Sequence, residues 1–263
     1  MLPKSSPGLA LTDNGSGPDV VLIHGQPGAS RDWAAVVERL DGRVRVIVPD
    51  RPGYGDTGGR AVGIGANTDA VIASLDGLGV EQVVVGGHSW GGAVALDLAQ
   101  RHPDRVRGLV LVGSVGGARS IDELDRVLAL PFLGPLMALA GLGLLRAPRL
   151  RRLVAIRAAP TAPDVIEALA VNLFDDWRSF VIEQRALLAE LPAIAGRVGE
   201  VDVPAVVVMG ETDRVVRTES QEALAAALPQ GRLVRLPGVG HLVPHEAPGP
   251  VADAVLAAAT GTL

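Results

Sequence analysis

The chain has 263 residues, of which 48% are hydrophobic and 20% charged, so it can form one large α/β domain with a substantial core. Its formal net charge is −5, which argues against a nucleic-acid partner because proteins that bind nucleic acids carry basic patches. The absence of cysteine excludes disulfides, thiolate metal sites and a cysteine nucleophile.

Short apolar runs alternate with helical patterns along most of the chain. Because continuous apolar strands separated by helices are buried on both faces, the pattern predicts an α/β fold with a mostly parallel sheet flanked by helices. The expected strands are residues 20–23, 44–48, 83–85, 109–112, 205–209 and 233–236. The expected helices are residues 33–40, 67–78, 90–100, 219–228 and 250–259.

Residues 116–197 interrupt this alternation. They contain apolar and helical pieces, several prolines and a basic stretch at residues 146–152, but no convincing strand. We interpret the basic stretch as a solvated helix face, with a membrane-surface role as the alternative. The simplest organisation is a first core part at residues 1–115, a helical cap or lid at residues 116–197, and a second core part at residues 198–263.

Residues 127–145 form an uncharged stretch that is long enough to suggest a membrane helix. Pro131 and Pro135 break the helical pattern, and three glycines weaken it further. We therefore predict a buried or lid-forming segment and no transmembrane span. The first residues lack the apolar core of a secretory signal, so we expect a cytoplasmic protein.

The stretch VVVGGHSWGGAVALDLA, residues 83–99, places one serine among four glycines. GHSWG matches G-x-S-x-G between an expected strand and an expected helix, which is the setting of a nucleophile elbow. The flanking positions require glycine because a Cβ there would collide with neighbouring backbone. A glycine-rich turn with a capping serine is the alternative. The context favours the elbow, with Ser89 as the nucleophile.

A serine hydroxyl needs a base that is oriented by a third group. His241 follows the last expected strand within GVGHLVPHEAP and is the predicted base, with His245 as the alternative. Asp213 lies in GETDRVV after the strand at residues 205–209 and is the predicted acid. Glu211 lies nearer the strand end and is the less favoured acid.

An oxyanion hole needs two backbone N–H groups. Trp90 follows the nucleophile and supplies the first, and Gln26 in HGQPG follows the first expected strand and supplies the second. A plain tight turn is the alternative for HGQPG.

No cofactor or metal site is expected. Residues 53–58 match G-x-G-x-x-G, but this motif does not open a helix directly after a strand, as a dinucleotide site requires. The chain also has no HExxH motif and no histidine pair at a metal-binding spacing.

HGQPG, PDRPGYGDTG, GHSWGG, GETDRVV and GVGHLVPHEAP occur in this order, and the chain resembles the α/β-hydrolase superfamily over nearly its whole length. The resemblance implies a central sheet with a helical cap, and Ser89, Asp213 and His241 as a triad. The N-terminal part is short for the usual first antiparallel strands, so we expect a trimmed sheet there. A membrane span at residues 127–145 would place the nucleophile Ser89 and the base His241 on opposite sides of the bilayer. We therefore predict that this segment forms an apolar lid over the site.

This reading predicts a serine hydrolase that cleaves carboxylic esters of small to medium apolar substrates through an acyl-enzyme. Carbon–carbon bond hydrolase, perhydrolase and prolyl-aminopeptidase-like activities use the same triad, and a non-catalytic ligand-binding protein can use the same fold. Epoxide hydrolases and haloalkane dehalogenases are disfavoured because they use an aspartate where Ser89 stands. The aminopeptidase alternative needs cap carboxylates, for which the candidates are Glu167, Asp175, Asp176 and Glu183. The natural substrate and the oligomeric state stay open.

Overall fold

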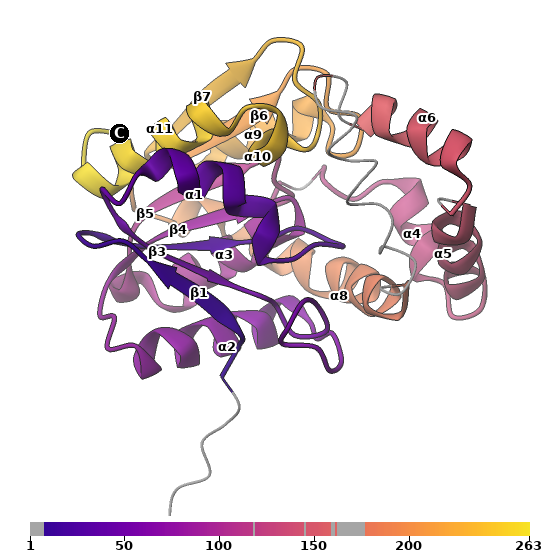
Figure 1. The fold of residues 1–263 in the computed structure, drawn as a ribbon, viewed down its shortest axis with the longest axis horizontal. Helices are drawn as coiled ribbons and strands as arrows, with labels where there is room; N and C mark the ends of the chain where they lie inside the picture. The colour runs from indigo at the N-terminus through magenta and orange to yellow at the C-terminus, as the bar shows by residue number, and fades with distance from the viewer. Residues whose placement is uncertain (1–7, 118, 145, 159–160, 162–176) are drawn as a thin grey trace, which may run out of the picture.

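A seven-stranded sheet runs through the molecule in the order β1-β3-β2-β4-β5-β6-β7 (Figure 1). The computed structural model describes residues 8–117, 119–144, 146–158, 161 and 177–263. β1 pairs with β3 antiparallel, and all other neighbouring strands are parallel. The strands are β1 Leu11–Asn14, β2 Asp19–Ile23, β3 Arg45–Pro49, β4 Val83–His88, β5 Val106–Val112, β6 Ala205–Gly210 and β7 Gly231–Leu236.

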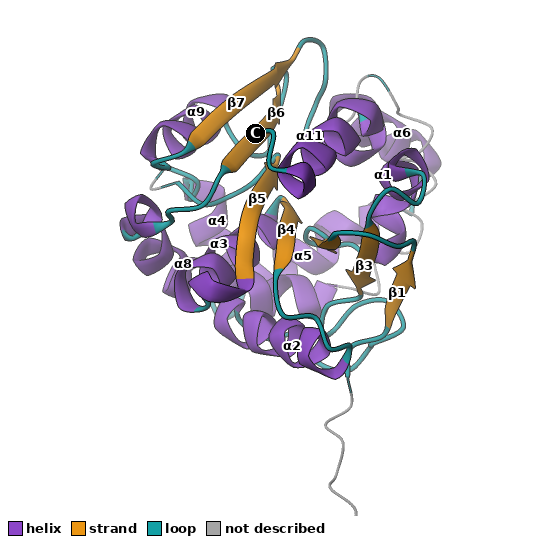
Figure 2. Ribbon diagram, turned by 90° about the vertical axis from the view of Figure 1, so that its left-hand side faces the viewer, coloured by secondary structure: helices purple, strands orange, loops and turns teal. Residues whose placement is uncertain are grey.

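Helices cover both faces of the sheet because successive strand residues point to opposite sides (Figure 2). Val21 and Ile23 belong to one buried apolar cluster, and Val20 and Leu22 belong to another on the opposite face. The predicted mostly parallel α/β sheet is therefore confirmed. Helices α2 Ile64–Gly77, α3 Trp90–Arg101 and α9 Thr218–Ala227 cover the first face, and α1 Ala34–Leu40 and α11 Pro248–Thr260 cover the second.

A group of helices follows β5 and precedes β6 in the sequence, and we call it the insert. In the described part of the chain it consists of α4 Glu123–Ala129, α5 Leu133–Leu144, α6 Pro148–Ala158 and α8 Trp177–Gly196. Helices α4, α5 and α6 lie at one end of the molecule, whereas α8 also packs against α2 and α3 (Figure 1). Three of the predicted cap carboxylates, Glu167, Asp175 and Asp176, fall outside the described residues.

Parts of the apolar segment at residues 127–144 are more exposed than the sequence suggested. Phe132 is 91% exposed and Leu136 is 63% exposed, so the expectation of a buried segment is wrong for these side chains. No single helix of the described residues is long and apolar enough to cross a membrane. Residues Glu123–Ala129 and Leu133–Gly141 meet the length and composition criterion only as a pair, and they are bent by 107° at their junction.

Several short elements complete the described fold. β1 is the one antiparallel edge strand, in keeping with the trimmed N-terminal sheet expected from the sequence. A single short helix, α10 Val243–Glu246, follows the last strand and precedes α11. The 3₁₀ turns are Ser30–Trp33, Pro103–Arg105 and Val198–Glu200.

Candidate active site

Ser89 stands at the junction of β4 and α3 with φ 52° and ψ −120°. Residues with a side chain rarely adopt a positive φ, so this conformation is strained. A Cβ on Gly87 would lie 2.4 Å from the carbonyl oxygen of Gly91, and one on Gly91 would lie 2.4 Å from the carbonyl oxygen of Ile23. Only hydrogen fits at either position, which is the physical reason for the glycines on both sides of the serine.

Ser89, His241 and Asp213 come together at one edge of the sheet. The Ser89 Oγ lies 3.0 Å from His241 Nε2, and His241 Nδ1 lies 2.9 Å from Asp213 Oδ2. The three residues follow β4, β7 and β6, whose parallel carboxyl ends share this edge. In the neutral ring, this bonding assigns the proton to Nδ1, which donates to the carboxylate, while Nε2 accepts from the hydroxyl.

Asp213 is fixed by donors on both carboxylate oxygens. Its Oδ1 accepts from the N–H groups of Val215 at 2.8 Å and Val216 at 2.9 Å, and its Oδ2 also accepts from Gln221 Nε2 at 3.0 Å. Burial opposes ionisation and raises the pKa of Asp213, but His241 and the two N–H groups outweigh it, so the pKa is lowered. Asp213 is therefore an anion that holds the imidazole in one orientation.

The other candidate groups lie elsewhere. The His88 Nε2–H donates to the carbonyl oxygen of His241 at 3.0 Å, and not to the serine hydroxyl. Burial and the nearby His241 ring lower the pKa of His88 to about 3, so it is neutral and supports the His241 loop. His245 Nε2 lies 3.9 Å from Asp32 Oδ1. Glu211 is exposed, and the structure places neither His245 nor Glu211 in the hydrogen-bonded chain.

The segments that carry the two predicted oxyanion donors meet beside Ser89. Gly25 precedes Gln26 and approaches the elbow so closely that an added Cβ would lie 3.1 Å from Ser89 Cβ. Trp90 is the first residue of α3 and is 2% exposed. The Gln26 side chain is directed to the insert, where its Nε2 donates to the carbonyl oxygen of Phe180 in α8 at 2.7 Å.

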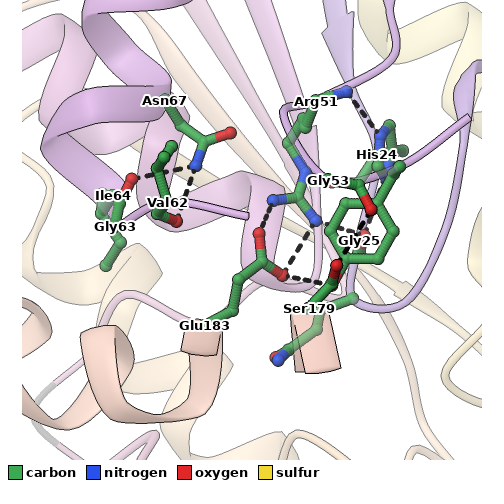
Figure 3. Close-up of polar contacts among 12 residues, drawn as sticks. His24, Gly25, Arg51, Gly53, Val62, Gly63, Ile64, Asn67, Ser179 and Glu183 are labelled. Carbon is green, nitrogen blue, oxygen red and sulfur yellow. Dashed lines mark hydrogen bonds and ion pairs between the residues drawn. The ribbon is translucent and has the colours of Figure 1, made fainter. Parts of the chain in front are cut away.

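Arg51 lies buried against His24 and Gly25, the two residues before Gln26, a contact that the sequence analysis missed (Figure 3). Its Nε donates to the carbonyl oxygen of His24 at 3.0 Å, and its Nη2 donates to that of Gly25 at 2.7 Å. Its backbone N–H donates to His24 Nε2 at 3.0 Å. Burial and the Arg51 charge hold the pKa of His24 well below its usual range, so the ring is neutral. Its Nδ1–H then donates to the Gly25 oxygen at 2.9 Å.

Glu183 on α8 is the charged partner of Arg51 (Figure 3). Both side chains are fully buried, and the Tyr54 hydroxyl donates to Glu183 Oε2 at 2.8 Å. The guanidinium also lies 4.5 Å from the centre of the Trp90 ring. The one sequence signal for Glu183 is its place on the buried α8 face with Ser179, Leu187 and Leu191, at helical spacing.

The comparisons with known proteins cover nearly the whole chain. The profile of the alpha/beta hydrolase family matches residues 20–254. The chain belongs to the alpha/beta hydrolase family. This hydrolase is 32% identical over 235 residues to the pimeloyl-[acyl-carrier protein] methyl ester esterase of Aromatoleum aromaticum, covering 85% of this chain and 91% of that one. It is 42% identical over 125 residues to a 2-hydroxymuconate semialdehyde hydrolase of a Pseudomonas species, covering 44% of each.

Solved structures agree with this assignment. A thermophilic esterase from Thermogutta terrifontis superposes on the hydrolase with a TM-score of 0.81 and 27% identity, covering 98% of this chain and 96% of that one. The meta-cleavage product hydrolase of Pseudomonas fluorescens gives a TM-score of 0.77 at 22% identity, with coverage of 96% and 94%, and shares the fold. The predicted superfamily, fold class and hydrolase activity are confirmed.

Proposed function

We propose that this hydrolase cleaves carboxylic esters by acyl transfer to Ser89 and then to water. The observation that carries the proposal is the continuous hydrogen-bonded chain from Ser89 Oγ through the His241 ring to Asp213, with contacts of 3.0 and 2.9 Å. A serine hydroxyl becomes an effective nucleophile when an oriented base accepts its proton. The esterase relatives described above favour an ester as the substrate.

The first half-reaction transfers the acyl group to the enzyme. Ser89 Oγ attacks the ester carbonyl carbon while His241 Nε2 takes the hydroxyl proton, and Asp213 stabilises the imidazolium that forms. The carbonyl oxygen becomes an oxyanion, which accepts from the N–H groups of Gln26 and Trp90. The carbon–oxygen bond to the alcohol breaks, and His241 returns the proton to the leaving oxygen.

The second half-reaction releases the acid. His241 takes a proton from water, the resulting hydroxide attacks the acyl carbon, and the same two N–H groups hold the new oxyanion. The bond to Ser89 Oγ breaks, and the proton returns from His241 to the serine. Water is the one co-reactant, and the products are a carboxylic acid and the regenerated hydroxyl.

We further propose that residues 116–197 act as a cap over core parts at residues 1–115 and 198–263. Contacts between α8 and the active-site loops support this role, because Gln26 donates to Phe180 and Ser179 Oγ donates to the Gly53 carbonyl oxygen at 2.9 Å. The apolar composition of residues 127–145 favours a small-molecule substrate with an apolar part.

Carbon–carbon bond hydrolysis is the second candidate. The 42% identity over 125 residues to a 2-hydroxymuconate semialdehyde hydrolase favours it. The aminopeptidase alternative loses one of its candidates for binding a substrate amine, since Glu183 is fully buried and paired with Arg51.

A series of p-nitrophenyl esters of increasing acyl length tests the proposal. Ser89→Ala is expected to lower kcat on the order of 10⁶-fold, as the loss of a triad nucleophile does elsewhere. Ser74→Ala on α2 is the matched control and is expected to keep full activity. A loss under tenfold for Ser89→Ala would contradict the assignment.

Two further measurements separate the alternatives. A fluorophosphonate probe is expected to label the wild-type protein and not Ser89→Ala, whereas a ligand-binding protein without turnover would show no Ser89-dependent labelling. A 2-hydroxy-6-oxo-dienoate and an aminoacyl arylamide panel are expected to turn over far more slowly than the best ester. A faster reaction with the dienoate would replace the ester by the carbon–carbon bond as the substrate.

A further inference from the structure

We propose that Arg51 and Glu183 are positioning residues for the oxyanion hole, so that the seating of α8 on the core sets the direction of the Gln26 N–H. The inference rests on the acyl transfer proposed above. Neither residue takes part in the hydrogen bonds that link Ser89, His241 and Asp213. Arg51 and Glu183 are 132 residues apart in the sequence.

The first step concerns the peptide unit that joins Gly25 to Gln26. Its carbonyl oxygen and its N–H lie in one plane and point in opposite directions, as in any trans peptide. Two donors hold the Gly25 oxygen, namely Arg51 Nη2 at 2.7 Å and His24 Nδ1 at 2.9 Å. Donors that fix the oxygen on one side also fix the N–H on the other side. The positive charge of the guanidinium beside the Gly25 oxygen also polarises the peptide unit, which makes the Gln26 N–H a stronger donor.

The second step concerns the other proposed donor. The Arg51 guanidinium lies 4.5 Å from the centre of the Trp90 ring, which is within the range of a cation–π contact. One guanidinium therefore contacts the peptide unit that carries the Gln26 N–H, through the Gly25 oxygen, and the ring of Trp90, whose N–H is the other proposed donor. Replacing it by an ammonium keeps the charge but loses the planar fork that reaches His24, Gly25 and Glu183 together.

The third step connects this guanidinium to the insert. Arg51 is fully buried, and a buried charge is tolerated when a counter-charge and hydrogen bonds accompany it. Glu183 supplies the counter-charge from α8, with the Tyr54 hydroxyl as a further donor to its carboxylate. Moving α8 away from the core would separate the pair, so the orientation of the guanidinium depends on where α8 sits.

The contrasting explanation is that the pair holds the fold together and nothing more. Loss of a purely structural pair would lower the unfolding temperature or the fraction of active enzyme, but each active site would keep its kcat. Loss of a positioning pair lowers kcat per active site, because oxyanion stabilisation is needed in the transition state and little in the bound substrate.

The variants are chosen to separate these explanations in the full-length protein. Glu183→Gln removes the charge with little change in shape, and Arg51→Lys keeps the charge without the fork. Tyr54→Phe removes one donor to Glu183 and leaves the ion pair in place, so it serves if a charge variant fails to fold. The matched control is Glu190→Gln, since Glu190 also joins α8 to the core, by accepting from the Gly65 N–H at 2.8 Å.

Active sites are counted by labelling with a fluorophosphonate, and kcat and KM for the best p-nitrophenyl ester are then expressed per labelled site. Glu183→Gln and Arg51→Lys are expected to lower kcat about 10- to 100-fold, less than deletion of a whole oxyanion donor, with KM within about threefold. Tyr54→Phe is expected to lower kcat about threefold, and Glu190→Gln less than twofold. Affinity for a trifluoromethyl ketone, whose hemiketal oxygen occupies the oxyanion hole, is expected to fall in proportion to kcat/KM.

Unchanged kcat per labelled site and unchanged trifluoromethyl ketone affinity in the folded variants would overturn the inference while leaving the proposed function intact. A wild-type protein that the fluorophosphonate does not label at Ser89 would overturn both.

Discussion

Glycine at position 89 should give a more stable protein than alanine at the same position. The residue has φ 52° and ψ −120°, a region that only glycine enters without strain, and such strain costs about 1–3 kcal/mol. Glycine also gives the unfolded chain more conformational freedom than alanine does, which reduces its stability advantage by about 0.4–1 kcal/mol. Both variants lose the hydrogen bond to His241, so that loss cancels. The free energy of unfolding of Ser89→Gly should thus exceed that of Ser89→Ala by about 1–2 kcal/mol.

Thermal unfolding, monitored by circular dichroism, measures this difference in the free energy of unfolding. For a protein of this size it corresponds to a rise in Tm of about 2–8 °C for glycine over alanine. Ser74 in the interior of α2 is the control, because Ser74→Gly should be less stable than Ser74→Ala by about 1 kcal/mol. An alanine variant at position 89 that is as stable as the glycine variant would show that the turn at Ser89 is unstrained.

Three other predictions concern the site and its surroundings. His241→Ala should abolish ester hydrolysis while His245→Ala keeps it within about threefold, measured as kcat, and equal losses would reject His241 as the base. Asp213→Asn should lower kcat about 10⁴-fold, and a loss under tenfold would remove its orienting role. Burial raises the pKa of Asp32 to about 6, so its folded form holds a proton more tightly than the unfolded form does. The wild type therefore loses stability as the pH rises from about 4 to 6, and Asp32→Asn should gain roughly 2 kcal/mol over it between pH 4 and pH 8. Urea unfolding at both pH values measures this gain, and an equal effect at each would contradict it.

The five inner strands, β2 to β6, could be predicted because they are buried on both faces. Continuous apolar runs such as residues 205–209 have few other uses in a chain of this composition. The edge strand β1, residues Leu11–Asn14, could not be predicted in the same way. Leu11 is its one apolar residue and the strand is largely exposed, so its pairing with β3 leaves no hydrophobic pattern in the sequence.

The residues of the candidate site also differ in whether the local sequence predicts them. Ser89, Asp213 and His241 each stand in a local motif at a strand end, so chain order and spacing were enough to select them. Glu183 carries no such signal, because a single carboxylate on a helix usually faces solvent. Its pairing with Arg51 depends on how α8 lies on the core, which is set by packing between segments distant in the chain.

The same pairing limits how freely this scaffold can exchange parts. A chimera that took residues 116–197 from a donor without an acidic side chain opposite Arg51 would bury a guanidinium without its counter-ion. Removal of one partner from such a pair typically costs about 3–5 kcal/mol, a large share of the stability of an ordinary domain. Recombination of these modules is therefore expected to succeed when both halves of the ion pair travel together, or when both are replaced by apolar residues.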